Sequence, residues 1–285
     1  MNSNRYPSMV QQYFVNRVDA LMEERQERLN ALKTKKAAEA YVTGIRRKIR
    51  TCFGKLPPKT ALNPVITREQ DLGDVILENV LFESRPGFLV SGNIYRPKTS
   101  GKLPVVLGLC GHSENGKAFA PYQAFARGLA LRGFLTLIID PISQGERRQF
   151  YPRDVKSGSL DCCRAHNVMG KQMGLIDDFF GTWRAWDAIR GLDLLLSDRQ
   201  ADKTHVGVTG CSGGGTLTTY VTALDKRVTM AAPDCFITTM LRNLKNELPS
   251  DSEQNPPGMI KSGLDQVDLL MAFAPRPTLI LYEER

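Results

Sequence analysis

The sequence is poor in cysteine and histidine, and it has no long apolar run. Six cysteines in 285 residues are too few for a disulfide framework, and no C-x-x-C pair indicates a zinc or redox site. The uncharged stretch 204–224 is long enough to span a membrane, but its Gly, Ser and Thr content makes it too polar for insertion. With 42% apolar residues, the chain is predicted to be globular, with reduced thiols and no membrane partner.

The start of the chain also lacks an apolar segment behind a basic one, so no secretory signal is visible. As written, the sequence predicts a cytoplasmic protein. Export of a longer parent protein is kept as the alternative. If the parent protein is exported to an oxidising compartment, a disulfide among Cys110, Cys211 and Cys235 is an alternative to three free thiols.

Acidic residues are scarce only at the beginning of the chain. The net charge is +8; residues 1–70 hold 14 Lys or Arg against 6 Asp or Glu, whereas residues 71–285 hold 24 of each. The excess belongs to predicted helices, where a solvated face explains it. We therefore expect no nucleic-acid partner.

Apolar residues recur with helical period over 12–53, in two stripes that meet near Thr34. Gly54 and the Pro57-Pro58 pair end the pattern, and a loop is expected up to about Asp74. The sequence thus predicts a basic helical extension and linker over residues 1–73, followed by one domain over residues 74–285.

From Asp74 to Pro97 the pattern alternates with period two around a turn, which predicts an antiparallel hairpin. Short apolar runs separated by helical segments then follow, as in strands buried on both faces of a parallel sheet. These runs are 104–110, 135–140, 205–209, 228–233 and 277–282. The order predicts an α/β fold with a mostly parallel sheet and helices on both faces.

The run 205–209 leads into Gly210-Cys211-Ser212-Gly213-Gly214, a G-x-S-x-G motif between a strand and a helix. In this setting the serine sits on a strained turn that exposes its hydroxyl, which makes Ser212 the candidate nucleophile. A Gly-rich structural turn is the alternative.

Backbone N–H groups near such a serine stabilise the oxyanion that forms when an ester carbonyl is attacked. Gly213 supplies one donor, and the loop after the run 104–110 supplies the other, assigned to His112 with Ser113 as the fallback. The same loop, Gly111 to Lys117, is a near match to a phosphate-binding P-loop. Ala118 stands where that motif has Ser or Thr, so nucleotide binding is kept only as a minor alternative.

The general base is the missing element. His205 precedes Ser212 by seven residues of strand, roughly 23 Å at 3.3 Å per residue, and His166 lies in an excursion of undetermined position. The chain order expected for this motif is Ser, acid, His, yet no histidine follows Ser212. We therefore expect the base, and the acid after 277–282, to lie outside this chain. Asp234 is the alternative acid within it.

Five segments together resemble the acetyl xylan esterase-like branch of the α/β-hydrolase superfamily, which is related to the dienelactone hydrolase and prolyl oligopeptidase branches. They are FGKLPPKTALNP, CGHSENGK, DPISQGER, WDAIRGLDLL and VGVTGCSGGGT. The resemblance runs from about Phe53 to Arg285. The sequence differs from the family at two positions. Cys110 stands where members often have His, and Asp234 stands where they often have a small polar residue.

The resemblance implies an α/β-hydrolase fold whose C-terminal part follows residue 285. It also implies a Ser-His-Asp/Glu triad, no metal, no cofactor, and acyl esters as substrates, above all acetylated carbohydrate. A glucuronoyl-type methylesterase and a peptidase stay open within the hydrolases. A non-catalytic binding protein with this fold is the alternative outside them, and the oligomeric state is not predicted.

Overall fold

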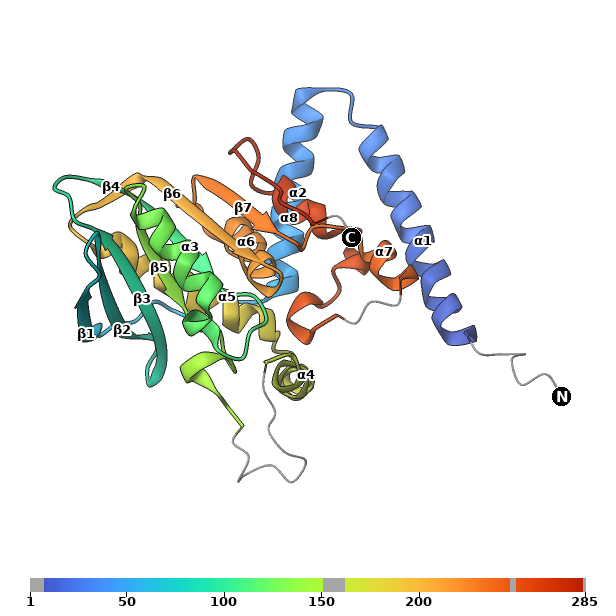
Figure 1. Ribbon diagram of the computed structural model, residues 1–285. Coiled ribbons are helices and arrows are strands. Elements are labelled where there is room, and N and C mark those ends of the chain that lie inside the picture. Colours follow the sequence, from blue (N-terminus) through green and yellow to red (C-terminus); the bar gives the residue numbers. More distant parts are fainter. Residues whose placement is uncertain (1–7, 151–161, 247–249, 284–285) are drawn as a thin grey trace.

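The computed structural model describes residues 8–150, 162–246 and 250–283 (Figure 1). Seven strands form one sheet in the order β1-β2-β3-β5-β4-β6-β7. They are β1 (Val65–Asp71), β2 (Val75–Arg85), β3 (Phe88–Pro97), β4 (Leu103–Leu109), β5 (Leu135–Ile139), β6 (Ala201–Cys211) and β7 (Met230–Asp234). The strands β4 to β7 run parallel, and β1 to β3 form an antiparallel extension that joins the sheet through the β3 and β5 pair. The predicted hairpin and parallel sheet are confirmed.

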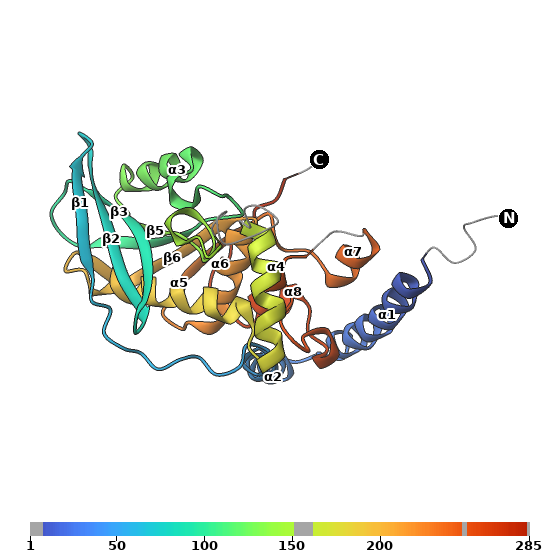
Figure 2. The same cartoon turned by 90° about the horizontal axis from the view of Figure 1, so that it is seen from below.

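Helices cover both faces of this sheet, as Figure 2 shows. The described α-helices are α1 (Met9–Asn30), α2 (Lys35–Phe53), α3 (Ala120–Ala130), α4 (Cys162–Met173), α5 (Phe180–Ser197), α6 (Gly213–Leu224), α7 (Met240–Lys245) and α8 (Gln266–Met271). The helix α3 packs on one face, against β3 and β5, whereas α5 and α6 lie side by side on the other. This arrangement confirms the α/β class.

The central parallel strands β4 and β5 are apolar along their length because both of their faces are covered. All five residues of β5 are buried, and in β4 only Pro104 is even partly exposed. Their side chains form the main core with α5 and α6. The carboxyl ends of β4, β5, β6 and β7 meet along one edge, where the predicted site residues lie.

The predicted linker before Asp74 is wrong for residues 65–71, which form the edge strand β1. Sequence pattern missed it because nearly every residue of β1 is exposed, so no apolar alternation marks it. The N-terminal helices also share a core with the rest of the chain, since Ile49 of α2 is buried in one cluster with Leu269 of α8. A buried Arg25–Asp268 ion pair of 2.8 Å joins α1 to α8. The side-chain packing therefore does not separate the N-terminal helices from the residues that follow position 73.

The last expected strand, 277–282, is not a regular strand. It follows the edge of β7 through two isolated parallel bridges, Ala231 to Thr278 and Asp234 to Leu281. Its apolar side chains Leu279, Ile280 and Leu281 are exposed.

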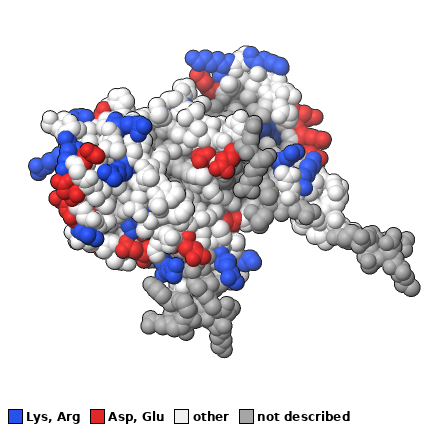
Figure 3. Space-filling model, viewed as in Figure 1, with Lys and Arg blue, Asp and Glu red and all other residues white. Residues whose placement is uncertain are grey.

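Basic and acidic side chains are both scattered over the face shown in Figure 3, and the basic ones do not gather into one continuous patch. Among the residues that the structure describes, no helix combines the length and the apolar character needed to cross a lipid bilayer.

Candidate active site

Ser212 occupies a sharp turn between β6 and α6. Its backbone has φ 57° and ψ −118°, a left-handed and strained conformation for a residue with a side chain. The turn is held by the Ser212 N–H, which donates to the carbonyl oxygen of Asp234 at 3.0 Å. A Cβ atom on Gly214 would lie 2.0 Å from the carbonyl oxygen of Leu109, and one on Gly210 would lie 2.3 Å from it. The glycines around Ser212 are therefore required by the close approach of β4, as the motif predicts.

The loop after β4 lies against this turn, and one buried side chain orients it. Gln144 donates through Nε2 to the carbonyl oxygens of Gly111 and Ser113, each at 2.7 Å. Because a trans peptide points its N–H away from its C=O, the first of these bonds turns the His112 N–H away from Gln144. Within the described residues, neither the His112 N–H nor the Gly213 N–H has a hydrogen-bond acceptor. Both predicted oxyanion donors are thus free to bind a substrate oxygen. Among the described residues, no hydrogen bond to the His112 carbonyl orients the peptide that carries the Ser113 N–H.

The His112 side chain contacts two carboxylates and packs against the turn that carries Ser212. Its Nε2 lies 2.7 Å from Glu253 Oε1 and 3.3 Å from Asp251 Oδ2. A Cβ atom on Gly213 would lie 2.6 Å from the same Nε2, so the imidazole sits directly against the first turn of α6. These contacts attach the loop to the segment that contains Asp251 and Glu253.

The other two histidines have different surroundings. The fully buried His166 lies with Nδ1 2.7 Å from Asp251 Oδ2 and with Nε2 2.9 Å from the Ile142 carbonyl oxygen. Burial, together with the Arg184 charge, lowers the pKa of His166 to about 4. His205 is exposed and pairs with Asp202 at the start of β6. In the part of the chain that the structure describes, none of the three histidines hydrogen-bonds to Ser212.

Asp234, the alternative acid, ends β7 beside the turn. Its main chain anchors Ser212, while its Oδ1 accepts a hydrogen bond from the Cys235 thiol at 3.1 Å. Among the described residues no histidine contacts its carboxylate, so a catalytic role for Asp234 stays a prediction. Burial and Asp234 raise the pKa of the neighbouring Cys211 to about 12, which keeps that thiol protonated and unreactive at neutral pH. Cys110, Cys211 and Cys235 are free thiols.

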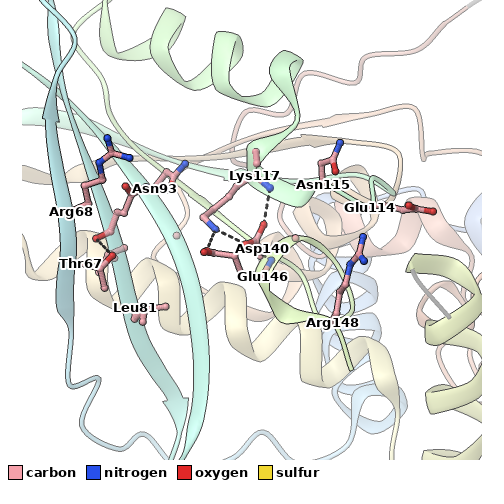
Figure 4. A pocket seen from close by; sticks show the side chains of 15 residues that line it. Thr67, Arg68, Leu81, Asn93, Glu114, Asn115, Lys117, Asp140, Glu146 and Arg148 are labelled. Atoms are coloured by element: carbon pink, nitrogen blue, oxygen red, sulfur yellow. Dashed lines mark hydrogen bonds and ion pairs between the residues drawn. The ribbon is translucent and has the colours of Figure 1, made fainter. Parts of the chain in front are cut away.

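The P-loop-like segment has a structural role. Lys117 is buried, and its Nζ contacts Asp140 Oδ2 at 2.5 Å and also Glu146, while its N–H donates to Asp140 Oδ1 at 2.7 Å. Figure 4 shows Lys117 between these two carboxylates at the wall of a cavity of about 660 Å³. The lysine that a nucleotide phosphate would need is therefore already neutralised, and the two loops CGHSENGK and DPISQGER are locked together by this contact.

Several residues that hold the site were not predicted from the sequence. Gln144 belongs to a quoted motif, but nothing in it marks the amide as a donor to the oxyanion loop. Arg184 is fully buried on α5 and ion-pairs with Glu253, and Asp251 contacts both His112 and His166. Asp251 and Glu253 stand more than 80 residues from these histidines in the sequence, so no local pattern could connect them.

The parallel sheet with its antiparallel extension, the strained serine after β6 and the loop after β4 together define an α/β-hydrolase. The acetyl xylan esterase (AXE1) family model matches residues 53–251, and the chain belongs to that family. The resemblance stated from the motifs is confirmed.

Similar proteins support the same fold. The Bacillus subtilis (strain 168) protein YtaP is 23% identical over 205 residues, which are 67% of this chain and 62% of YtaP. Methylesterase BT1017 has a TM-score of 0.71 and 24% identity, with 92% of this chain and 55% of that chain covered. The acetyl xylan esterase from Paenibacillus sp. R4 has a TM-score of 0.56 and 18% identity, with coverage of 89% and 90%. This chain thus spans only 62% of YtaP and 55% of BT1017.

Proposed function

We propose that the protein is a serine hydrolase of carboxylic esters and that Ser212 is its nucleophile. The observation that carries this proposal is the strained backbone of Ser212, at φ 57° and ψ −118°, between a buried parallel strand and a helix. This conformation exposes the serine hydroxyl at the end of the sheet, beside two unused N–H donors. A structural glycine turn would need no serine in a strained conformation.

The geometry supports acyl transfer in two steps. Ser212 Oγ attacks the ester carbonyl carbon and gives its proton to a general base, while the carbonyl oxygen becomes an anion near the N–H groups of Gly213 and His112. Collapse breaks the ester C–O bond, and the protonated base gives its proton to the leaving alcohol. Water then attacks the acyl-serine in the same way and releases the acid. Each oxyanion donor is worth about 2.7–4 kcal/mol in such enzymes.

We assign the general base to an imidazole outside residues 1–285. Among the described residues none of the three histidines hydrogen-bonds to Ser212: His112 contacts Glu253 through Nε2, His166 is fully buried between Asp251 and Ile142, and His205 lies at the far end of β6. The catalytic acid must contact the base, so the location of the base determines which residue is the acid. Asp234 is the candidate acid within this chain.

The substrates we propose are acetyl esters of carbohydrates. Support comes from the family and from the Paenibacillus acetyl xylan esterase, which shares the fold. The cavity in Figure 4 is lined by polar side chains, among them Glu114 and Asn115 of the loop after β4 and Asn79 and Asn93 of the neighbouring strands β2 and β3. Amides and carboxylates of this kind can hydrogen-bond sugar hydroxyls.

The test is an ester panel run on the polypeptide that the gene encodes, with Ser212→Ala as the matched control. Release of acetate from acetylated xylan, lost in the control, is the expected result. Preference for methyl-esterified uronic acids would replace the acetyl assignment with the activity named for BT1017. Preference for long acyl chains would contradict the carbohydrate assignment, and no ester turnover at all would contradict the hydrolase.

A further inference from the structure

Four side chains with metal-binding atoms meet beside the oxyanion loop. They are His112, Cys163, His166 and Asp251, and their ligand atoms all lie within 4.8 Å of one another. They come from three separate segments: the loop after β4, the helix α4, and the residue that precedes the short helix η5 (Ser252–Gln254). Asp251 and His166 are buried, whereas His112 and Cys163 are partly exposed, so an ion could enter from solvent.

The hydrogen bonds of His166 place its Nδ1 lone pair where it could bind a cation. The Ile142 carbonyl oxygen, 2.9 Å from Nε2, can only accept, so Nε2 carries the proton of the neutral ring. The lone pair of Nδ1 then faces Asp251 Oδ2 at 2.7 Å, so these two acceptors either share a proton or move apart to the roughly 3.3 Å that separates two ligands of a bound metal ion. Histidines that bind metals usually donate their other N–H to a carbonyl or carboxylate, as Nε2 does here.

Asp251 gives a second and independent indication. Its side chain is 3% exposed, and among the described residues its Oδ1 has no hydrogen-bond partner. Buried carboxylate oxygens are rarely left in this state. The 3.3 Å between Asp251 Oδ2 and His112 Nε2 matches the separation of about 3.3 Å between two ligands of a tetrahedral Zn²⁺ ion. Binding the ion would exchange the 2.7 Å contact of this Nε2 with Glu253 for a bond to the metal.

The charges in this part of the interior favour a divalent ion as well. Asp251 and Glu253 bring two negative charges, and the buried Arg184 brings one positive charge. These three side chains together carry one net negative charge. A Zn²⁺ ion that displaces the proton of Cys163 adds two positive charges and one negative charge, so the cluster becomes neutral.

We propose that His112, Cys163, His166 and Asp251 bind one Zn²⁺ ion in a closed structural site. Two imidazoles, a thiolate and a carboxylate are a donor set that suits zinc rather than magnesium or calcium. The ion would fasten α4 and the segment before η5 to the loop that carries the His112 N–H. The site is separate from ester hydrolysis, and its test does not depend on catalytic activity.

A second group of possible ligands, Cys211, Asp234 and Cys235, provides an internal control. It offers three ligand atoms instead of four and no histidine. Both groups contain partly exposed thiols, so a serine substitution in each compares the two sites with the same chemistry.

The experiment titrates the metal-free protein with Co²⁺ and then with Zn²⁺. A thiolate ligand gives Co²⁺ a sulfur-to-metal charge-transfer band in the near ultraviolet. The proposal predicts this band at one Co²⁺ per chain and its loss on addition of one equivalent of Zn²⁺. Cys163→Ser is expected to remove the band and to weaken Zn²⁺ binding by about tenfold or more, whereas Cys235→Ser retains both.

Circular dichroism of the metal-free variants confirms that each is folded. If Cys163→Ser is unfolded, Cys163→Ala replaces it with the same expected result. A protein that binds neither ion would overturn the proposal. So would a charge-transfer band that survives in the Cys163 variants, or one that disappears in Cys235→Ser.

Discussion

The side-chain amide of Gln144 donates a 2.7 Å hydrogen bond to the carbonyl oxygen of Gly111 and thereby orients the peptide that carries the His112 N–H. Gln144 is fully buried, so water cannot replace it without a change in packing. It is a positioning residue, because it acts on the proposed oxyanion site through the loop and not on the substrate.

Gln144→Ala should therefore lower kcat by about 10- to 100-fold and leave KM nearly unchanged, since the oxyanion forms only in the transition state. Steady-state kinetics with an acetyl ester measure the two constants. Gln123→Ala is the matched control, because Gln123 makes a similar 2.7 Å bond to a carbonyl at an exposed position. A larger effect on KM than on kcat would contradict the positioning role.

Gly214→Ala should destabilise the fold by about 3 kcal/mol, because the new methyl group would lie 2.0 Å from the Leu109 carbonyl oxygen. Denaturant unfolding measures the loss. At Gly207, on the same strand as the turn, a Cβ would meet its neighbours only at 3.4 Å and beyond, so Gly207→Ala should be tolerated. Equal stability of the two variants would show that β4 and the turn are less closely packed than described.

Lys117→Met should cost about 3–5 kcal/mol of folding stability, because it leaves the buried Asp140 carboxylate without its cation. Lys98→Met removes an exposed ion pair with Asp71 and should change little. Thermal unfolding with and without ATP completes the test, since a buried Lys117 predicts no stabilisation by ATP. Stabilisation that Lys117→Met abolishes would restore the nucleotide-binding alternative.

The N-terminal helices should be needed for stability. Ile49 of α2 is 1% exposed in the cluster shared with α8, so Ile49→Ala is expected to cost about 2–5 kcal/mol. The control Ile66→Ala lies at an exposed position of β1 and should cost less than about 0.5 kcal/mol. If Ile49→Ala unfolds at the same denaturant concentration as the parent chain, the helices form the separate extension that the sequence suggested.

Sequence reasoning succeeded where the signal is local. The strand, the glycines and the helix around Ser212 lie within about twenty consecutive residues, and each has its own pattern. The strands β4 to β7 are likewise marked by their apolar runs, and those of β4 and β5 are almost completely buried. The exposed β1 has no such mark, and its pairing with β2 is set by backbone hydrogen bonds that any side chain allows.

The interior beside the site could not be predicted in the same way. Its contacts join residues that are distant in the chain, such as His112 with Glu253 and His166 with Asp251. Cys163 and His166 are three residues apart on α4, a spacing that indicates nothing until Asp251 and His112 are seen next to them. The absence of a C-x-x-C pair therefore did not exclude a zinc site built from separate segments.

The central claim is that Ser212 is a nucleophile whose oxyanion site is formed but whose base is absent from residues 1–285. A fluorophosphonate probe tests it, with the labelled residue identified by peptide mass spectrometry and with free imidazole added as a substitute base. We expect weak labelling without imidazole, faster labelling of Ser212 as the imidazole concentration rises, and none in Ser212→Ala. Failure to label Ser212 at any imidazole concentration, or fast labelling without imidazole, would contradict the account.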